Sequence, residues 1–139
     1  MSAKWMAARR DMEAPLVRKT FELAGADSAV IRICGLGFFE LWINGVRVGE
    51  DLFNPAWTDY GHREFSRLLY PMPNRFEHRR YYLEYDIGGL LRKGDNVLSV
   101  LLGNGWYRQN QRNIEGNLWY DDRLKLWFDL AYVTDGEIY

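Results

Sequence analysis

The sequence predicts an all-β fold, an antiparallel β-sandwich or jelly roll without long helices. Apolar and polar residues alternate with the period of a strand in about eight short segments. Turn signals separate these segments, most clearly Asn44-Gly45 and Asp135-Gly136. No segment of ordinary helix length repeats its apolar residues with helical spacing, and several short strands with turns between them are typical of sandwiches.

Length and composition indicate one domain with a full core. The chain has 139 residues, and the hydrophobic fraction of 47% argues against disorder. The net charge of −1 disfavours a nucleic-acid partner, because phosphate binding needs an excess of cations. Cys34 is the only cysteine, so we expect a buried thiol, with no intramolecular disulfide and no cysteine metal cluster.

The sequence shows no targeting signal, which leads us to expect a cytoplasmic protein without a membrane partner. No apolar run approaches the ~18 residues of a membrane span. Residues 1–15 lack the apolar core of a signal peptide. We interpret residues 1–15 as a lead-in strap that Trp5 anchors, and residues 16–139 as the single sandwich domain.

The first half of the domain contains an edge strand, a second strand and a hairpin. Residues 16–23 alternate weakly and form the expected edge strand, and residues 29–34 form the next. Gly35-Leu36-Gly37 then bends the chain, since glycine inside a strand often marks a bulge. In the hairpin, residues 38–44 return as 46–48 through Asn44-Gly45, which tolerates positive φ at both turn positions.

The second half contains four further strand signals. Residues 65–70 are a weak candidate that ends at Pro71, and residues 81–86 alternate clearly. A short helical turn with Leu90 and Leu91 tucked inward precedes residues 97–102, an apolar run expected to be a central strand buried on both faces. The last strand is the clearest, and it places these residues on one face: Leu124, Leu126, Phe128, Leu130 and Tyr132.

Polar and aromatic residues gather in the loops after two of these strands. If the strands are near neighbours, Trp57, Asp59 and Tyr60 face Asn104, Trp106 and Tyr107. Aromatic rings cover the C–H faces of a pyranose while Asn and Asp meet its hydroxyls. The candidate carbohydrate-binding residues are Asn54, Trp57, Asp59, Tyr60, Asn104, Trp106, Tyr107, Glu115 and Asn117. The alternative is that Trp106 and Tyr107 plug the end of the sandwich and Asp59 caps its own turn.

No catalytic residue is assigned. Asp59 with Glu115 is the one carboxylate pair that could face a common space, and nothing in the sequence fixes that geometry. Asp121-Asp122 could offer oxygens to calcium, without the spacing of an EF-hand. His62 and His78 stand alone, without a carboxylate or cysteine at the spacing of a zinc site.

Three stretches carry a family resemblance. They read GLGFFELWINGVRVGEDLFNPAWTDY, YDIGGLLRKGDNVLSVLLGNGWY and RLKLWFDLAYVTDG. Together they resemble the N-terminal β-sandwich domain of bacterial α-L-rhamnosidases, glycoside hydrolase family 78, over roughly Leu16 to Gly136. The spacing of ING…VG…PAWTDY to LLGNGWY is the specific part. The second stretch alone also resembles galactose-binding-like jelly rolls, so it supports the fold more than the substrate.

The resemblance implies an accessory role in a larger enzyme. Family members are multidomain and carry their two catalytic carboxylates in a downstream (α/α) barrel, which this chain lacks. The chain is then expected to be a fragment of an enzyme that removes terminal α-L-rhamnose, inactive alone, with the barrel and a rhamnose-containing glycoside as partners. Related modules bind L-rhamnose, in some cases through calcium, so calcium is the one cofactor considered.

Other roles stay open at this point. The chain could be an independent carbohydrate-binding module, or a purely structural domain that packs on the barrel or on a second subunit of a homo-oligomer. The connection between Tyr60 and Tyr85 is longer than the family usually needs, and residues 69–80 look like an insertion.

Overall fold

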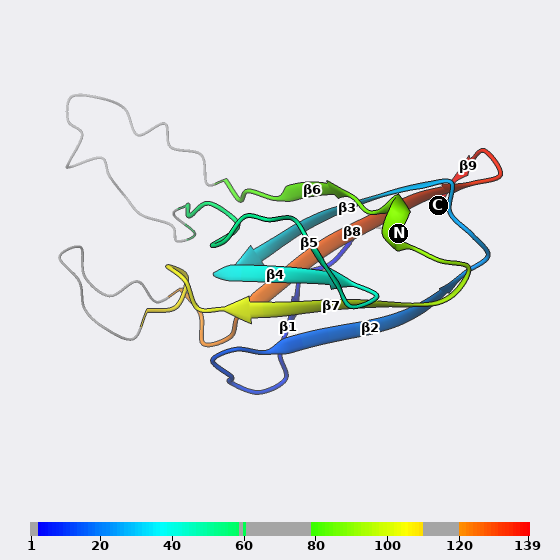
Figure 1. Ribbon diagram of the computed structural model, residues 1–139. Coiled ribbons are helices and arrows are strands. Elements are labelled where there is room, and N and C mark those ends of the chain that lie inside the picture. Colours follow the sequence, from blue (N-terminus) through cyan, green and yellow to red (C-terminus); the bar gives the residue numbers. More distant parts are fainter. Residues whose placement is uncertain (1–2, 59, 61–78, 110–119) are drawn as a thin grey trace, which may run out of the picture.

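The computed structural model describes residues 3–58, 60, 79–109 and 120–139. Two antiparallel sheets pack face to face (Figure 1). The loops that precede β4 (Phe38–Ile43) and follow β7 (Gly94–Gly103) lie at the same end of the sandwich. The predicted antiparallel β-sandwich is therefore confirmed. The one helical element in the described residues is a 3-10 turn, η1 (Gly88–Leu90), at the position of the predicted helical turn. None of the helical structure in these ranges is long or apolar enough to span a bilayer.

One sheet has five strands in the order β1-β8-β3-β6, with β9 paired to β8. Its strands are β1 (Met6–Ala7), β3 (Ser28–Leu36), β6 (Leu83–Asp86), β8 (Lys125–Thr134) and β9 (Glu137–Ile138). The long pair β3 and β8 forms its centre, in a register that sets Ile31 opposite Leu130 and Gly35 opposite Leu126.

The other sheet has four strands in the order β2-β7-β4-β5. Its strands are β2 (Leu16–Leu23), β4 (Phe38–Ile43), β5 (Val46–Val48) and β7 (Gly94–Gly103). Among the described strands, β2 pairs with β7 alone, so the predicted edge strand is confirmed. β7 lies between β2 and β4, which confirms its central position.

Both predicted hairpin turns are present. Asn44 and Gly45 have φ of 52° and 82°, and Asp135 and Gly136 have φ of 51° and 80°. Positive φ at both central positions is the geometry whose twist suits a two-residue hairpin. These turns fix the registers β4–β5 and β8–β9.

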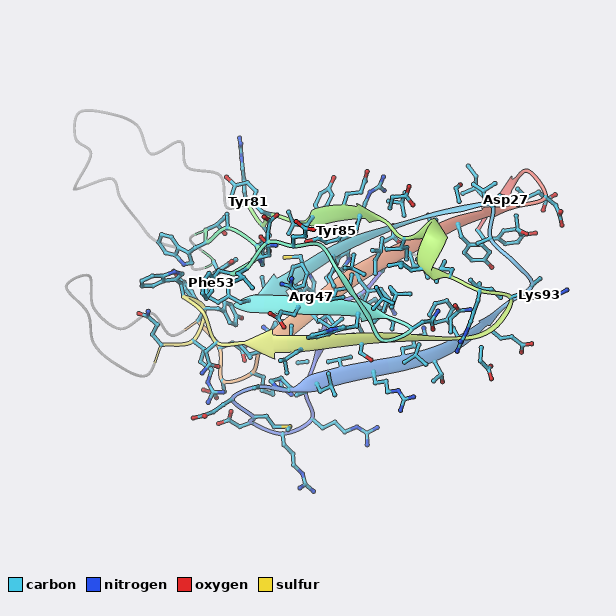
Figure 2. All side chains as sticks on the ribbon, viewed as in Figure 1. Asp27, Arg47, Phe53, Tyr81, Tyr85 and Lys93 are labelled. Carbon is cyan, nitrogen blue, oxygen red and sulfur yellow. The ribbon has the colours of Figure 1, made fainter. Side chains whose placement is uncertain are left out.

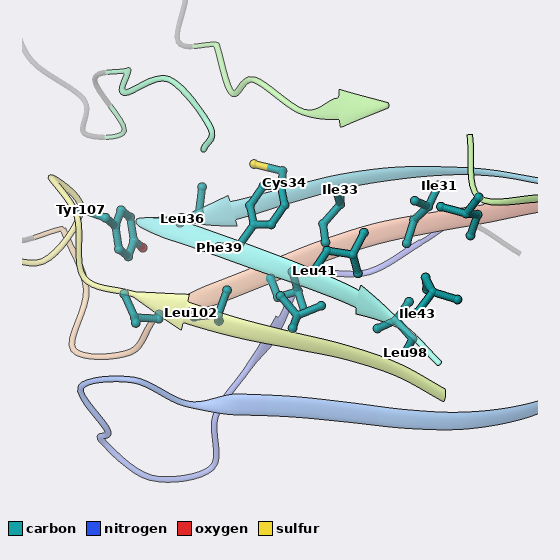
Figure 3. Packing of buried hydrophobic residues seen from close by; sticks show 14 of the residues in the cluster. Ile31, Ile33, Cys34, Leu36, Phe39, Leu41, Ile43, Leu98, Leu102 and Tyr107 are labelled. Carbon is teal, nitrogen blue, oxygen red and sulfur yellow. The ribbon is translucent and has the colours of Figure 1, made fainter. Parts of the chain in front are cut away.

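Alternate side chains of the central strands fill the space between the sheets. Figure 3 shows this cluster, with Tyr107 at one end of it beyond Leu36 and Leu102. The residues with the least exposure are Ile31, Ile33, Leu41, Ile43, Ile87, Leu98, Val100, Leu102, Leu124 and Leu126.

One detail of the predicted core is wrong. β7 is fully buried on one face only, because Val97, Ser99 and Leu101 on its outer face are half-buried. Leu90 and Leu91 pack against the core as predicted and are partly buried, and Ile87 beside η1 is fully buried. The predicted strand 65–70 lies outside the described residues.

The bend between β3 and β4 rests directly on the end of β7. Gly37 has φ of 108°, and a Cβ there would overlap the carbonyl oxygen of Gly103. Only glycine allows both this backbone conformation and this approach. The contact brings the end of β3 beside the loop that follows Gly103, where the candidate site lies.

Candidate functional site

A cavity of about 360 Å³ lies at the end of the sandwich where β3 finishes and β8 begins. We call it the tyrosine cavity. Its lining residues come from six separate segments of the chain and are Trp5, Leu36, Tyr60, Arg80, Tyr107, Tyr120 and Lys125.

The floor of the tyrosine cavity is the outer face of the five-stranded sheet. Leu36 and Lys125 are register partners, one position beyond the inward-facing pair Gly35 and Leu126. A Cβ on Gly35 would lie 3.1 Å from Cβ of Phe39 in the opposite sheet, so the next residue along points outward. Leu36 is nevertheless buried, because loop residues cover this end of the outer face.

Three tyrosines form the cover. The ring of Tyr60 meets those of Tyr107 and Tyr120 edge-on, with centroids 5.2 and 5.4 Å away. Tyr107 and Tyr120 stack with centroids 5.7 Å apart, and the backbone amide of Tyr120 donates to the carbonyl of Tyr107 at 3.2 Å. Edge-on and stacked arrangements of this kind are favourable aromatic geometries, so the cover is a packed unit.

A cation is held on the cavity floor by polar partners. Lys125 Nζ lies 2.6 Å from Asp121 Oδ2, and the backbone amide of Arg123 donates to Asp121 Oδ1 at 3.0 Å. The hydrogen bond to Asp121, with a further one to Tyr107, raises the pKa of Lys125. The same contact with Lys125 lowers the pKa of Asp121. The pair therefore stays ionised at neutral pH.

Three weak acids at or near the cavity stay neutral at physiological pH. Burial raises the pKa of the Cys34 thiol to about 11. Burial likewise raises the pKa values of Tyr60 and Tyr107. Desolvation disfavours the charged form of each of these acids, so the cavity presents hydroxyls and cations.

The structure brings together only part of the predicted site. Tyr60 and Tyr107 are in contact, as the predicted proximity of the two loops requires. Tyr107 is only 3% exposed, which favours the packing interpretation for this residue. Trp57 and Trp106 are 43% and 46% exposed and do not line the tyrosine cavity.

Two of the three predicted asparagines lie in the described residues, and their backbone carbonyls accept hydrogen bonds from other backbone amides. The carbonyl of Asn54 accepts a hydrogen bond from the amide of Phe39 at 2.8 Å, and its side chain reaches the Tyr85 hydroxyl at 3.5 Å. The carbonyl of Asn104 accepts from the amides of Tyr107 and Arg108. Its side-chain oxygen is buried and finds no hydrogen-bond partner in the ranges that the structure describes. The predicted residues Asp59, Glu115 and Asn117 lie outside the described residues.

Five residues that line the cavity were not predicted as site residues: Trp5, Leu36, Arg80, Tyr120 and Lys125. For Lys125 the sequence did offer a signal, because the alternation in the last strand places it on the face away from the core. For calcium, Asp121 already meets a lysine, and no group of three potential metal-ligating side chains occurs in the described part of the chain.

Comparison with known proteins gives one consistent family. The family model described as the α-L-rhamnosidase N-terminal domain matches residues 24–68 and 61–138. An α-L-rhamnosidase of Formosa agariphila is 37% identical over 84 residues, covering 60% of this chain and 7% of the relative. An α-L-rhamnosidase of Streptomyces avermitilis is 35% identical over 75 residues, covering 54% of this chain and 6% of the relative. The chain spans less than a tenth of the length of these relatives.

Solved structures agree in fold. The native α-L-rhamnosidase of Aspergillus terreus matches with a TM-score of 0.74 and 27% identity, over 97% of this chain and 15% of that chain. The Streptomyces avermitilis α-L-rhamnosidase, solved in complex with L-rhamnose, matches with a TM-score of 0.70 and 30% identity, over 91% of this chain and 11% of that chain.

Proposed function

The chain belongs to the family of α-L-rhamnosidase N-terminal domains, and we propose that it is a non-catalytic accessory domain of a glycoside hydrolase that removes terminal α-L-rhamnose. Its role in that enzyme is to recognise the saccharide through the tyrosine cavity. The family match supports the assignment to an enzyme of this class. The residues around the cavity support a role in recognition without catalysis.

The distribution of carboxylates supports a non-catalytic role. Most glycosidases need two carboxyl groups facing one another across the scissile bond. In the described part of the chain, no carboxylate lines the tyrosine cavity, and Asp121 at its edge is bound to Lys125. Two other cavities are lined by one carboxylate each, Asp129 and Glu40. None of the three contains the pair that hydrolysis needs.

The composition of the tyrosine cavity supports saccharide recognition, and this observation carries the proposal. Aromatic rings surround a space within the usual size range of small-ligand sites, and polar groups reach into it from β8 and from the neighbouring loops. Rings provide flat apolar surface for sugar C–H groups, and the hydroxyl, ammonium and guanidinium groups are hydrogen-bond partners for sugar hydroxyls.

A structural role is the second candidate, and an exposed apolar surface favours it. Phe53 is 72% exposed, and it lies with Leu52 over Phe38 and Leu101 on the outer face of the four-stranded sheet. Figure 2 shows Phe53 at the same end of the sandwich as Tyr81, opposite the end that carries Asp27 and Lys93. Exposed apolar patches of this kind often mark contacts with another domain.

An assay of hydrolysis by the isolated chain tests the proposed non-catalytic role. We expect the 139-residue chain to release no nitrophenol from 4-nitrophenyl α-L-rhamnoside above the buffer rate, with a full-length α-L-rhamnosidase as positive control. Release that scales with chain concentration and survives repurification would overturn the non-catalytic assignment.

A further inference from the structure

Among the described residues, the tyrosine cavity is lined by two cations, and only one of them is paired with a carboxylate. Arg80 and Lys125 line it, and Asp121 is the one described carboxylate that contacts either of them. We propose that the cavity is selective for an acidic saccharide, a sugar unit that carries a carboxylate, with Arg80 as the anion-binding residue. This inference rests on the proposed recognition function and adds the chemical class of the ligand.

Lys125 is already paired with Asp121. Its ammonium group lies 2.6 Å from Asp121 and also donates to Tyr107, and these contacts hold it in the floor of the cavity. A positive charge that is paired in this way positions Tyr107 and contributes little attraction to a second anion.

Arg80 is the cation left for a ligand. In the ranges that the structure describes, it forms no ion pair, and its electrostatic influence reaches both Tyr107 and Cys34. A guanidinium group presents parallel N–H donors that match the two oxygens of a carboxylate, which a neutral sugar lacks. A carboxylate bound there would pair with the guanidinium charge of Arg80.

The other described lining residues carry no negative charge that would repel an anion. The phenols of Tyr60 and Tyr107 are neutral at physiological pH, since burial raises their pKa values. Trp5 and Tyr120 add aromatic surface on which the sugar ring can lie. An acidic pyranose can therefore satisfy the ring surface and the arginine at once.

The test compares two sugars that differ at one carbon. The 139-residue chain is titrated by heteronuclear NMR with D-glucuronate and with D-glucose, and separately with methyl α-L-rhamnoside as the neutral ligand of the proposed function. We expect D-glucuronate to bind roughly tenfold more tightly than D-glucose, the effect of one charge-assisted hydrogen-bonding contact. High salt should reduce this preference, because it screens the charge.

Variants assign the preference to Arg80. Arg80→Gln should bind both sugars equally, Arg80→Lys should keep part of the preference, and Arg79→Gln, one residue away and not in the cavity lining, should bind as the parent does. Equal affinity of the parent chain for both sugars overturns the inference. If methyl α-L-rhamnoside still binds, saccharide recognition stands without acid selectivity. If none of the three binds, both proposals fall.

Discussion

The side-chain amide of Asn44 donates a hydrogen bond of 2.8 Å to the side-chain oxygen of Asn96, which is fully buried. The two residues join the β4–β5 turn to the start of β7. Asn44 Oδ1 accepts from the amide of Val97 at 2.8 Å, and Asn44 also donates to the carbonyl of Leu90. Asn96 in turn binds the loop that leads into β7, through the backbone of Arg92 and Gly94.

Replacing Asn96 should destabilise the fold strongly. Asn96→Ala removes the partners of the Arg92 amide, the Asn44 side chain and two carbonyls while the site stays buried. Unpaired buried polar groups are costly, so we expect a loss of about 2–3 kcal/mol in the free energy of unfolding. Urea denaturation followed by tryptophan fluorescence measures it.

Ser99→Ala is the matched control, because Ser99 lies on the half-exposed outer face of the same strand. It should change stability by less than about 0.5 kcal/mol. A similar loss in both variants would show that the strand, and not the asparagine network, is the sensitive feature.

Local sequence patterns predicted the parts of the fold that local chemistry determines. Asn44-Gly45 and Asp135-Gly136 form the expected turns, since few residue pairs accept positive φ twice. Asn96 lies inside β7, whereas the predicted strand begins at residue 97, because asparagine after Gly-Asp resembles a loop residue. Its role depends on Asn44, which is 52 residues away in the sequence.

The candidate site was only partly predictable for the same reason. Tyr60 and Tyr107 follow recognisable turn and strand-end signals. Lys125 and Leu36 become neighbours only through the β3–β8 register, and no local pattern encodes the order of strands in a sheet. The position of Arg80 at the cavity depends in addition on the path that the chain takes into β6.

Gly37 should tolerate no side chain. In Gly37→Ala the new Cβ would overlap the carbonyl oxygen of Gly103, and φ of 108° is unfavourable for any other residue. We expect a loss of at least about 2 kcal/mol in thermal or urea unfolding. Gly89→Ala, where a Cβ meets nothing within 4 Å, is the control and should be close to neutral. Equal effects of the two changes would rule out the Gly103 contact as the cause.

Alkaline pH should destabilise the chain through Cys34. Its thiol has a pKa of about 11 when folded and 9.0 ordinarily, so the unfolded chain loses its proton first. The contribution is fully present below pH 9 and is lost as pH rises towards 11. Unfolding free energies at pH 8, 9 and 10 should fall more steeply for the parent chain than for Cys34→Ala. Parallel slopes would mean that the thiol titrates normally in the folded state.

We expect Phe53 to contribute to contact with another domain and not to the stability of this fold. It combines high exposure with φ of 61°, a conformation that is costly for a large residue. Phe53→Asn, which tolerates positive φ, should leave the melting temperature unchanged or raise stability by up to about 1 kcal/mol. A clear loss of stability would show that the edge-on contact with Phe38, at 5.4 Å, matters more than the backbone conformation.

The most direct test of the central claim is to map saccharide binding on the isolated chain. The isotope-labelled 139-residue chain is titrated with methyl α-L-rhamnoside, and Tyr120→Ala is compared with Tyr81→Ala, an exposed tyrosine outside the cavity lining. We predict shifts centred on Tyr60, Tyr107, Tyr120 and the Trp5 indole, lost in Tyr120→Ala and retained in Tyr81→Ala. Absence of shifts up to about 50 mM sugar, or shifts centred elsewhere, would contradict recognition through the tyrosine cavity.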